Sequence, residues 1–279
     1  MKPTAIITLI AAMLTLASGC TQGDKKIKLT LKWEPGMTLD YEQVTKRSFK
    51  AYRADSLVSE GFTTYSIKVA QEVKNVGSDG IADVIESSAW TIVRPGKEDS
   101  AVMDTSTYER EMILKIKPNG KIVDFSFAKE EETSSAAYVK NYYEQGIPVF
   151  PSVEMSPGKE WTQETRVVLP EESLEASTTY RIKSLAREAG YDCALIEYEG
   201  NLVIPIVPDT KDSVWRAGID RVSSTGIMYF AYKEGVVVLQ RERWVIDGER
   251  RESKGADTVQ TRIASEVDSE YVLKKRAFK

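Results

Sequence analysis

The sequence predicts a mainly β protein: a curved antiparallel sheet, or pair of sheets, in two similar halves with one central α-helix. Three observations predict this fold. Hydrophobic residues recur at every second position along most of the chain, Pro-Gly and Asn-Gly pairs separate the alternating runs, and one central segment lacks the alternation. The 279 residues are 42% hydrophobic and carry a net charge of −4, which indicates a globular protein with a sizeable core.

The first half of the chain carries six alternating runs, which we expect to be strands. The first run places Ile27, Leu29, Leu31 and Trp33 on one face. The pair Asn119-Gly120 predicts a hairpin between the last two runs, because both residues tolerate positive φ. The runs cover residues 26–33, 39–43, 62–73, 80–90, 112–116 and 122–127.

The central segment 128–145, "AKEEETSSAAYVKNYYEQ", predicts one helix of about four turns. Three glutamates at 130–132 would lie near its N-terminus, where the helix dipole favours negative charge. Gly146 would end the helix, and an extended proline-containing link at 147–151 would follow. Three tyrosines would pack one helix face on the concave side of the sheet or, alternatively, contact a ligand: Tyr138, Tyr142 and Tyr143.

The second half carries six further alternating runs, and Asp247-Gly248 predicts a tight turn after the fifth of them. The runs cover residues 162–169, 178–186, 193–206, 226–233, 236–246 and 258–267.

A weak internal repeat relates the two halves, as when "TTYSIK" in the first recurs as "TTYRIK" in the second. Duplication is the expected origin, with chance similarity of strand-forming residues as the alternative. The matching segments, in the same order, are Pro35-Gly36 with Pro157-Gly158, 63–68 with 178–183, Gly80 with Gly190, and Asn119-Gly120 with Thr225-Gly226. The expected units are a β unit at 27–127, a helix and link at 128–157, and a second β unit at 158–279.

The first 19 residues have the pattern of a secretory signal peptide. Lys2 is positive, the run 4–17 is apolar and nearly uncharged, and Ala17-Ser18-Gly19 are small. This run is shorter than the roughly 20 residues that a membrane-spanning helix needs. One alternative is cleavage by the ordinary signal peptidase beside an incidental cysteine at position 20.

The stretch "LASGC" that ends at Cys20 resembles the bacterial lipobox, with Ala17 where that family most often has leucine. The resemblance implies that residues 1–19 are cleaved off between Gly19 and Cys20, that the Cys20 thiol carries a diacylglycerol, and that 20–26 form an anchor linker. Acyl chains would then hold the protein on a membrane. By the same resemblance, Thr21 in place of aspartate implies an outer-membrane location facing the periplasm.

Enzyme chemistry has little support in the sequence. Histidine is absent, which excludes Ser-His-Asp and Cys-His catalysis and histidine-bound zinc. Of the carboxylate pairs, Glu171-Glu172 and Glu197 with Glu199, the second shares a strand face and could in principle act as acid and base. The stretch 209–212 lacks the spacing of a calcium loop, and Cys193 is expected to be a small buried strand residue. We therefore expect no catalytic residue, no metal and no cofactor, and the charge gives no indication of nucleic-acid binding.

The mature chain resembles an uncharacterised family of Bacteroidetes-type envelope lipoproteins through "LKWEPGMTLDYE", "KIKPNGKIVDF", "SPGKEWTQ" and "GYDCALI". Its layout is also similar to periplasmic lipoprotein-carrier half-barrels, which implies a curved sheet around an apolar cavity. The expected function is a lipid-anchored envelope protein that binds a hydrophobic ligand or a protein partner. The alternatives are a structural or assembly lipoprotein without a small ligand, and a carboxylate-based hydrolase. The tryptophans could fill the core or line a ligand site: Trp33, Trp90, Trp161, Trp215 and Trp244.

Overall fold

The computed structural model describes residues 25–95, 103–128, 140, 143–145, 147–168, 173–211, 214–254 and 257–278. Eleven antiparallel strands form one curved sheet, which confirms the predicted fold class. The strands are β1 (Met37–Arg53), β2 (Ser56–Val76), β3 (Ala82–Pro95), β4 (Met103–Ile116), β5 (Ile122–Phe127), β6 (Glu160–Val168), β7 (Ser173–Glu188), β8 (Tyr191–Lys211), β9 (Val214–Ala231), β10 (Val236–Lys254) and β11 (Asp257–Phe278).

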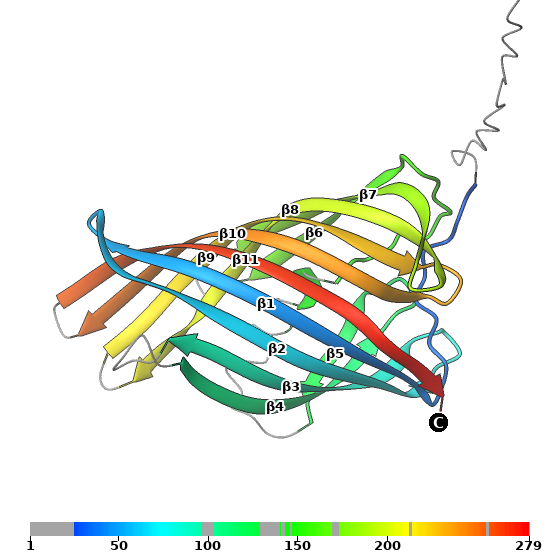
Figure 1. Ribbon diagram of the computed structural model, residues 1–279, viewed down its shortest axis with the longest axis horizontal. Helices are drawn as coiled ribbons and strands as arrows, with labels where there is room; N and C mark the ends of the chain where they lie inside the picture. Colours follow the sequence, from blue (N-terminus) through cyan, green and yellow to red (C-terminus); the bar gives the residue numbers. More distant parts are fainter. Residues whose placement is uncertain are drawn as a thin grey trace, which may run out of the picture.

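The first and last strands meet in the middle of the sheet. The strand order is β5-β4-β3-β2-β1-β11-β10-β9-β8-β7-β6, so β1 to β5 form one side and β6 to β11 the other (Figure 1). The repeated segments 63–68 and 178–183 lie on β2 and β7, the second strand of each side. Thr225-Gly226 lies inside β9, whereas Asn119-Gly120 lies in the β4–β5 turn. This pair of matching segments therefore does not occupy equivalent positions in the two halves.

Residues 25–33, which we call the strap, cross one end of the sheet, and we call this the closed end (Figure 1). The backbone N–H of Leu31 donates to the carbonyl oxygen of Pro118 at 2.7 Å, and that of Lys32 donates to the carbonyl oxygen of Gly235 at 3.3 Å. The strap therefore bridges the β4–β5 and β9–β10 turns. The opposite end, where the β1–β2 and β10–β11 hairpins reach their tips, is the open end.

The predicted strand at residues 26–33 is wrong, although the predicted alternation is present. Ile27 and Leu29 are buried while the lysines between and before them are exposed. Only an isolated bridge from Ile27 to Met155 links the strap to another extended segment in the part of the chain that the structure describes. An extended segment turns successive side chains to opposite sides whether or not it belongs to a sheet, which explains the shared pattern.

The concave face is packed solid at the closed end. The strap and the link after the helix supply Leu29 and Phe150 to one core cluster, and β1 to β4 supply most of a second. The largest side chains that are almost fully buried are Leu29, Met37, Leu39, Val73, Val84, Met112, Leu114, Ile182, Ile196, Met228 and Phe230. Burial of this size is the main source of stability for the sheet.

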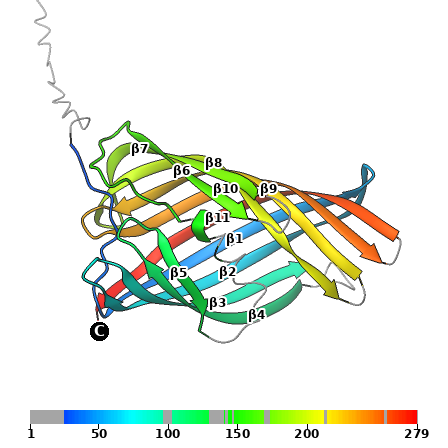
Figure 2. The ribbon, with the colours of Figure 1, turned by 180° about the vertical axis from the view of Figure 1, so that it is seen from behind.

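A short helical turn fills the space between the two edge strands, β5 and β6 (Figure 2). The ring of Tyr143 lies 5.9 Å from that of Phe125 on β5. On the other side, the Gln163 side chain of β6 donates from Nε2 to the carbonyl oxygen of Glu144 at 2.8 Å. The turn therefore closes part of the open seam of the sheet.

The helix prediction is confirmed only where the structure describes it, at residues 140 and 143–145. The expected start at Ala128 is wrong, because its N–H donates to the carbonyl oxygen of Glu111 and so extends the β4–β5 ladder. Tyr138, Tyr142 and Gly146 lie outside the described residues. Among the described residues, no helix has the length and apolar character needed to cross a membrane.

The predicted turn at Asp247-Gly248 is also wrong, because both residues lie inside β10 and pair with Ala264 and Ile263 of β11. Two contacts explain why the strand continues. The Asp247 carboxylate forms an ion pair with Arg262 on the convex face at 2.9 Å. On the concave face, Gly248 leaves room for a carboxylate from β9, as described below.

The convex face carries a grid of cross-strand ion pairs. Their side chains are about half exposed, so each pair contributes roughly 0–1 kcal/mol. Their value lies in keeping this face compatible with water. The pairs are Lys183–Glu197, Arg221–Glu249, Arg241–Glu270, Arg243–Glu266 and Arg262–Asp247.

Candidate functional site in the concave face

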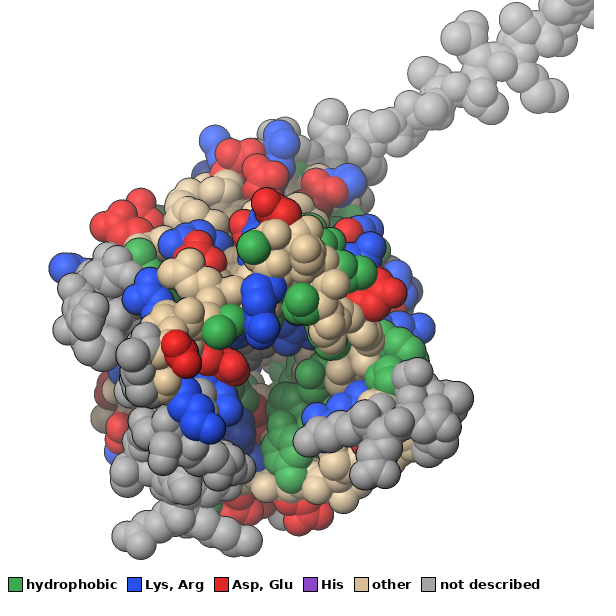
Figure 3. All heavy atoms as spheres, turned by 90° about the vertical axis from the view of Figure 1, so that its left-hand side faces the viewer, with side chains coloured by type: hydrophobic (Ala, Val, Ile, Leu, Met, Phe, Trp, Pro, Cys, Tyr) green, Lys and Arg blue, Asp and Glu red, His purple; other side chains and the backbone are tan. Residues whose placement is uncertain are grey.

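Side chains on the concave face become more exposed from the closed end toward the open end. On β4, Met112 and Leu114 are 0% and 1% exposed, Arg110 is half-buried, and Tyr108 is 38% exposed. Seen from the open end, the molecule is hollowed, and hydrophobic and basic side chains surround the hollow (Figure 3). The packed core therefore gives way to an open trough, which is the candidate site.

The two sides of the trough differ in character. On the aromatic wall, from β2 to β4, Trp90 stacks on Tyr108 with ring centroids 5.2 Å apart and meets Tyr65 edge-on at 6.5 Å. The aliphatic wall spans β8 to β11, where Ile204 and Trp244 pack, half-buried, against a buried cluster. That cluster consists of Leu202, Val222, Ile246 and Val267. The aromatic side chains, together with Ile204 and Trp244, offer apolar surface of the kind that binds acyl chains and rings.

Glu86 of β3 lies on the concave face beside the helical turn and is only 6% exposed. Its carboxyl oxygens accept hydrogen bonds from Gln71 Nε2 and from the Tyr143 hydroxyl, each at 2.8 Å. Burial raises the pKa of the Glu86 carboxyl, and these two hydrogen bonds only partly oppose the rise. Through the hydrogen bond from Tyr143, Glu86 links β3 to the helical turn between β5 and β6.

A second inward-facing carboxyl, Glu242 of β10, is half-buried and belongs to a separate network. It accepts from the Tyr198 hydroxyl at 3.1 Å, and Gln240 Nε2 donates to the same hydroxyl at 2.9 Å. The Tyr198 ring covers Gly226, where a Cβ atom would come within 2.4 Å of it. Burial raises the pKa of the Glu242 carboxyl as well. Among the described residues, the two carboxyls share no hydrogen-bond partner.

The raised pKa of Glu86 predicts a specific pH dependence of stability. Because the folded pKa lies above the unfolded value of about 4.3, the favourable contribution is complete below that pH and is lost as the pH rises through the folded pKa. We expect Glu86→Gln to lose less stability than the wild type between pH 5 and pH 8 in urea titrations. The exposed-face variant Glu197→Gln serves as the control, and a wild-type pH dependence in Glu86→Gln would contradict the assignment.

An ion pair lies on the concave face of β9 and β10. Arg250 Nη1 lies 2.6 Å from Asp220 Oδ1, and the two side chains are 21% and 8% exposed. Two glycines make room for the pair: a Cβ at Gly248 would approach the Asp220 carboxylate, and one at Gly218 would approach Arg250. Gly248 is the cross-strand partner of Asp220, and Gly218 is the cross-strand partner of Arg250. Arg250 is thereby neutralised inside the trough.

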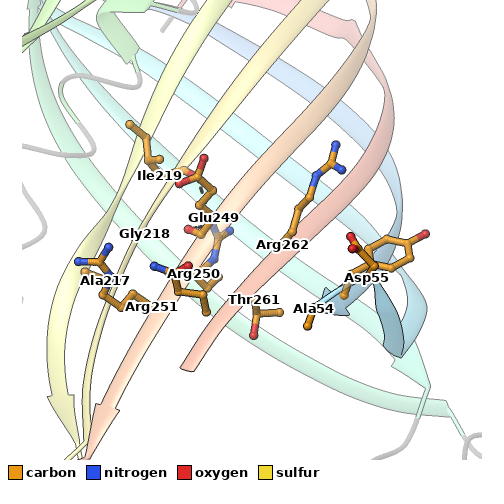
Figure 4. Close-up of a pocket in the computed structure, with 12 residues that line it drawn as sticks. Ala54, Asp55, Ala217, Gly218, Ile219, Glu249, Arg250, Arg251, Thr261 and Arg262 are labelled. Atoms are coloured by element: carbon orange, nitrogen blue, oxygen red, sulfur yellow. Dashed lines mark hydrogen bonds between the residues drawn. The ribbon is translucent and has the colours of Figure 1, made fainter. Parts of the chain in front are cut away.

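A groove of about 520 Å³ at the open end has a different lining (Figure 4). It extends from the tip of the β1–β2 hairpin, with Tyr52 and Asp55, across β11 and β10 to β9. Arg251, Arg262 and Glu249 contribute charges to it. This groove is more charged than the trough walls, and it shares Gly218 and Arg250 with the ion pair described above.

The predicted site residues are placed as follows. Gly19 and Cys20 lie outside the described residues, so lipid attachment stays a prediction. Cys193 is a buried residue of β8, as predicted, and burial raises the pKa of its thiol to about 11. Glu197 and Glu199 point to the convex face, where Glu197 pairs with Lys183, so they do not form an acid–base pair in the trough.

The remaining candidates from the sequence are carboxylates and tryptophans. Glu171, Glu172 and Asp212 lie outside the described residues, and the side chain of Trp215 is not described. Four tryptophans pack partly buried against core clusters, and two of these, Trp90 and Trp244, also border the trough. No group of three His, Cys, Asp or Glu side chains suited to a metal ion occurs among the residues that the structure describes.

Sequence reasoning missed Glu86 and Glu242. Both occupy positions in phase with the inward-facing residues of a predicted strand, between Val84 and Ser88 in one case and between Gln240 and Trp244 in the other. The sequence could have revealed both, because each glutamate falls at a position where the alternation predicts an inward-facing residue.

The chain was compared with known proteins. No protein-family model matches the chain, and no curated protein matches its sequence. Function is therefore inferred from the geometry of the sheet itself.

Proposed function

We propose that this protein is a lipid-anchored cell-envelope protein that binds a hydrophobic ligand in the open half of its trough. The observation that carries the proposal is the fall in burial along the concave face, from 0% exposure at Met112 to 38% at Tyr108. The aromatic side chains of one wall, with Ile204 and Trp244 of the other, remain partly exposed there, while the aliphatic cluster beside Ile204 and the concave surface at the closed end are buried. Monomeric soluble proteins seldom leave large connected apolar surface without a partner.

The position of the strap determines which end of the molecule the proposed anchor would hold near the membrane. Cys20 lies five positions before Lys25, and five extended residues span at most about 18 Å. An acylated Cys20 would hold the closed end near the bilayer and leave the trough opening away from it. Ligand would then enter from the aqueous side, in the periplasm under the proposed outer-membrane location.

The alternative is a structural or assembly lipoprotein without a small ligand. The packed closed end favours it, because much of the concave face is filled by the protein's own side chains. The two functions differ in one measurable respect, which is whether the open half of the trough takes up an apolar molecule.

Ligand binding is tested with the fluorescent apolar probe N-phenyl-1-naphthylamine and with native mass spectrometry. We expect the wild type to bind the probe and to retain lipid from cells. Ile204→Asp, on the aliphatic wall, should weaken probe affinity roughly tenfold or more, because it replaces apolar contact with a charge. Val245→Asp is the matched control, because Val245 is 51% exposed on the convex face. Absence of probe and lipid binding in the folded wild type would favour the structural alternative.

The anchor is tested separately by Cys20→Ser. We expect this variant to leave the membrane fraction and to lack the mass of the acyl groups, since two or three acyl chains are needed for firm attachment. Intact-protein mass spectrometry and membrane fractionation measure both effects. Cys193→Ser provides the control because its buried thiol is remote from the proposed processing site. Unchanged mass and fractionation of Cys20→Ser would contradict the lipoprotein assignment.

A further inference from the structure

Arg47 lies on the concave face of β1, between the two walls of the trough. Its cross-strand partners are Val267 of the aliphatic wall and Thr63 of β2, next to the aromatic wall. The side chain is half-buried, so part of its guanidinium group remains open to the hollow. A cation at this position is unusual in apolar surroundings, because its burial costs free energy unless a counter-charge compensates it.

The guanidinium group is held by one fixed contact. Arg47 Nε donates to Ser265 Oγ at 2.9 Å, and Ser265 is only 4% exposed. The Ser265 hydroxyl in turn donates to the carbonyl oxygen of Ser48 at 2.6 Å, which sets it as an acceptor for Arg47. The hydrogen bond uses one of the five N–H groups of arginine and leaves the two terminal nitrogens for another acceptor.

No ion pair joins Arg47 to a carboxylate in the part of the chain that the structure describes. By contrast, Arg250 on the concave face of β10 is neutralised by Asp220 at 2.6 Å. Arg110 adds a second positive charge, stacked 5.9 Å from the ring of Tyr108 on the aromatic wall. The middle of the trough thus has an apolar wall on each side, with Arg47 between the walls and Arg110 on the aromatic wall.

We propose that Arg47 binds the anionic head group of the ligand, and that the ligand is an amphiphile with an apolar chain and a carboxylate or phosphate head. The planar fork of a guanidinium group matches both head groups with paired, charge-assisted hydrogen bonds. The chain of the ligand would lie along the walls. This inference rests on the proposed function and adds the chemical class of the ligand to it.

The test compares a fluorescent sixteen-carbon fatty acid with its methyl ester, both titrated into the full chain carrying Cys20→Ser so that no detergent competes. We expect the acid to bind roughly 10- to 100-fold more tightly than the ester, as expected for a hydrogen bond to a charged group. Arg47→Met should remove this preference and leave ester affinity unchanged. Arg47→Lys should keep part of the preference, because it retains the charge without the fork.

The controls separate the possible failures. Arg243→Met removes an arginine from the convex face and should keep the preference for the acid. Equal binding of acid and ester by the wild type would overturn the head-group assignment while leaving the ligand site intact. Binding of neither probe would overturn the proposed function as well. A lysophosphatidate that binds as tightly as the acid supports the shared anionic chemistry, whereas inorganic phosphate that binds as tightly would indicate a free-anion site and overturn the proposal.

Discussion

Asp220→Ala is expected to lower the free energy of unfolding by about 3–5 kcal/mol, the usual cost of leaving one partner of a buried ion pair alone. The Asp220 carboxylate is the counter-charge of Arg250 on the concave face, at 2.6 Å. Arg250 also donates to the carbonyl oxygen of Glu249 at 3.1 Å, which holds it in place but does not neutralise it. The variant would therefore retain a largely buried positive charge without its counter-charge, above the space left over Gly248.

Urea unfolding of four proteins measures this effect. The wild type, Asp220→Ala, Arg250→Met and the double variant form a cycle that separates the pairwise interaction from the loss of each side chain. Asp247→Ala removes an exposed partner of Arg262 on the adjacent strand pair, β10 and β11, and should cost no more than about 1 kcal/mol. A cost for Asp220→Ala as small as that of the control would show that the pair is solvated.

The same residues show what the sequence could and could not predict. Alternation located β10 up to Ile246, because the inward positions before it are mostly apolar. Beyond that point the inward positions are Gly248 and Arg250, so the apolar pattern stops although backbone pairing with β11 continues to Lys254. Taken alone, the pair Asp247-Gly248 predicted a turn. Gly248 instead leaves room for the Asp220 side chain of β9, and the local sequence does not reveal that neighbour.

The buried carboxyls follow the same reasoning. Alternation correctly assigns Glu86 to the inward face of β3, and that assignment was available from the sequence. What makes the burial tolerable is Tyr143, which comes from a helical turn 57 residues away and donates to the carboxyl at 2.8 Å. Arg47 is similar, since its environment depends on Ser265, 218 residues away. The fold class could be predicted from local periodicity, whereas the site depends on contacts between distant strands.

Leu29→Ala is expected to lower the free energy of unfolding by about 2–5 kcal/mol, the range measured for leucines in a packed core. Leu29 is 1% exposed and belongs to the cluster that holds Phe150 and Phe230. This burial holds the strap on the sheet together with its hydrogen bonds to Met155, Pro118 and Gly235. Loss of the buried contact should also loosen the backbone around the exposed Lys28 and Lys32, so that trypsin cleaves there faster.

Urea unfolding and the rate of tryptic cleavage within the strap measure the two consequences. Lys28→Ala, at an exposed position beside Leu29, is the matched control and should leave the urea midpoint unchanged. If Leu29→Ala unfolds at a lower urea concentration and is also cleaved faster, the strap is an integral part of the core. If both stay at wild-type values, the closed end is held by the sheet alone. The strap would then be a linker rather than the rigid connection between the proposed anchor and the trough.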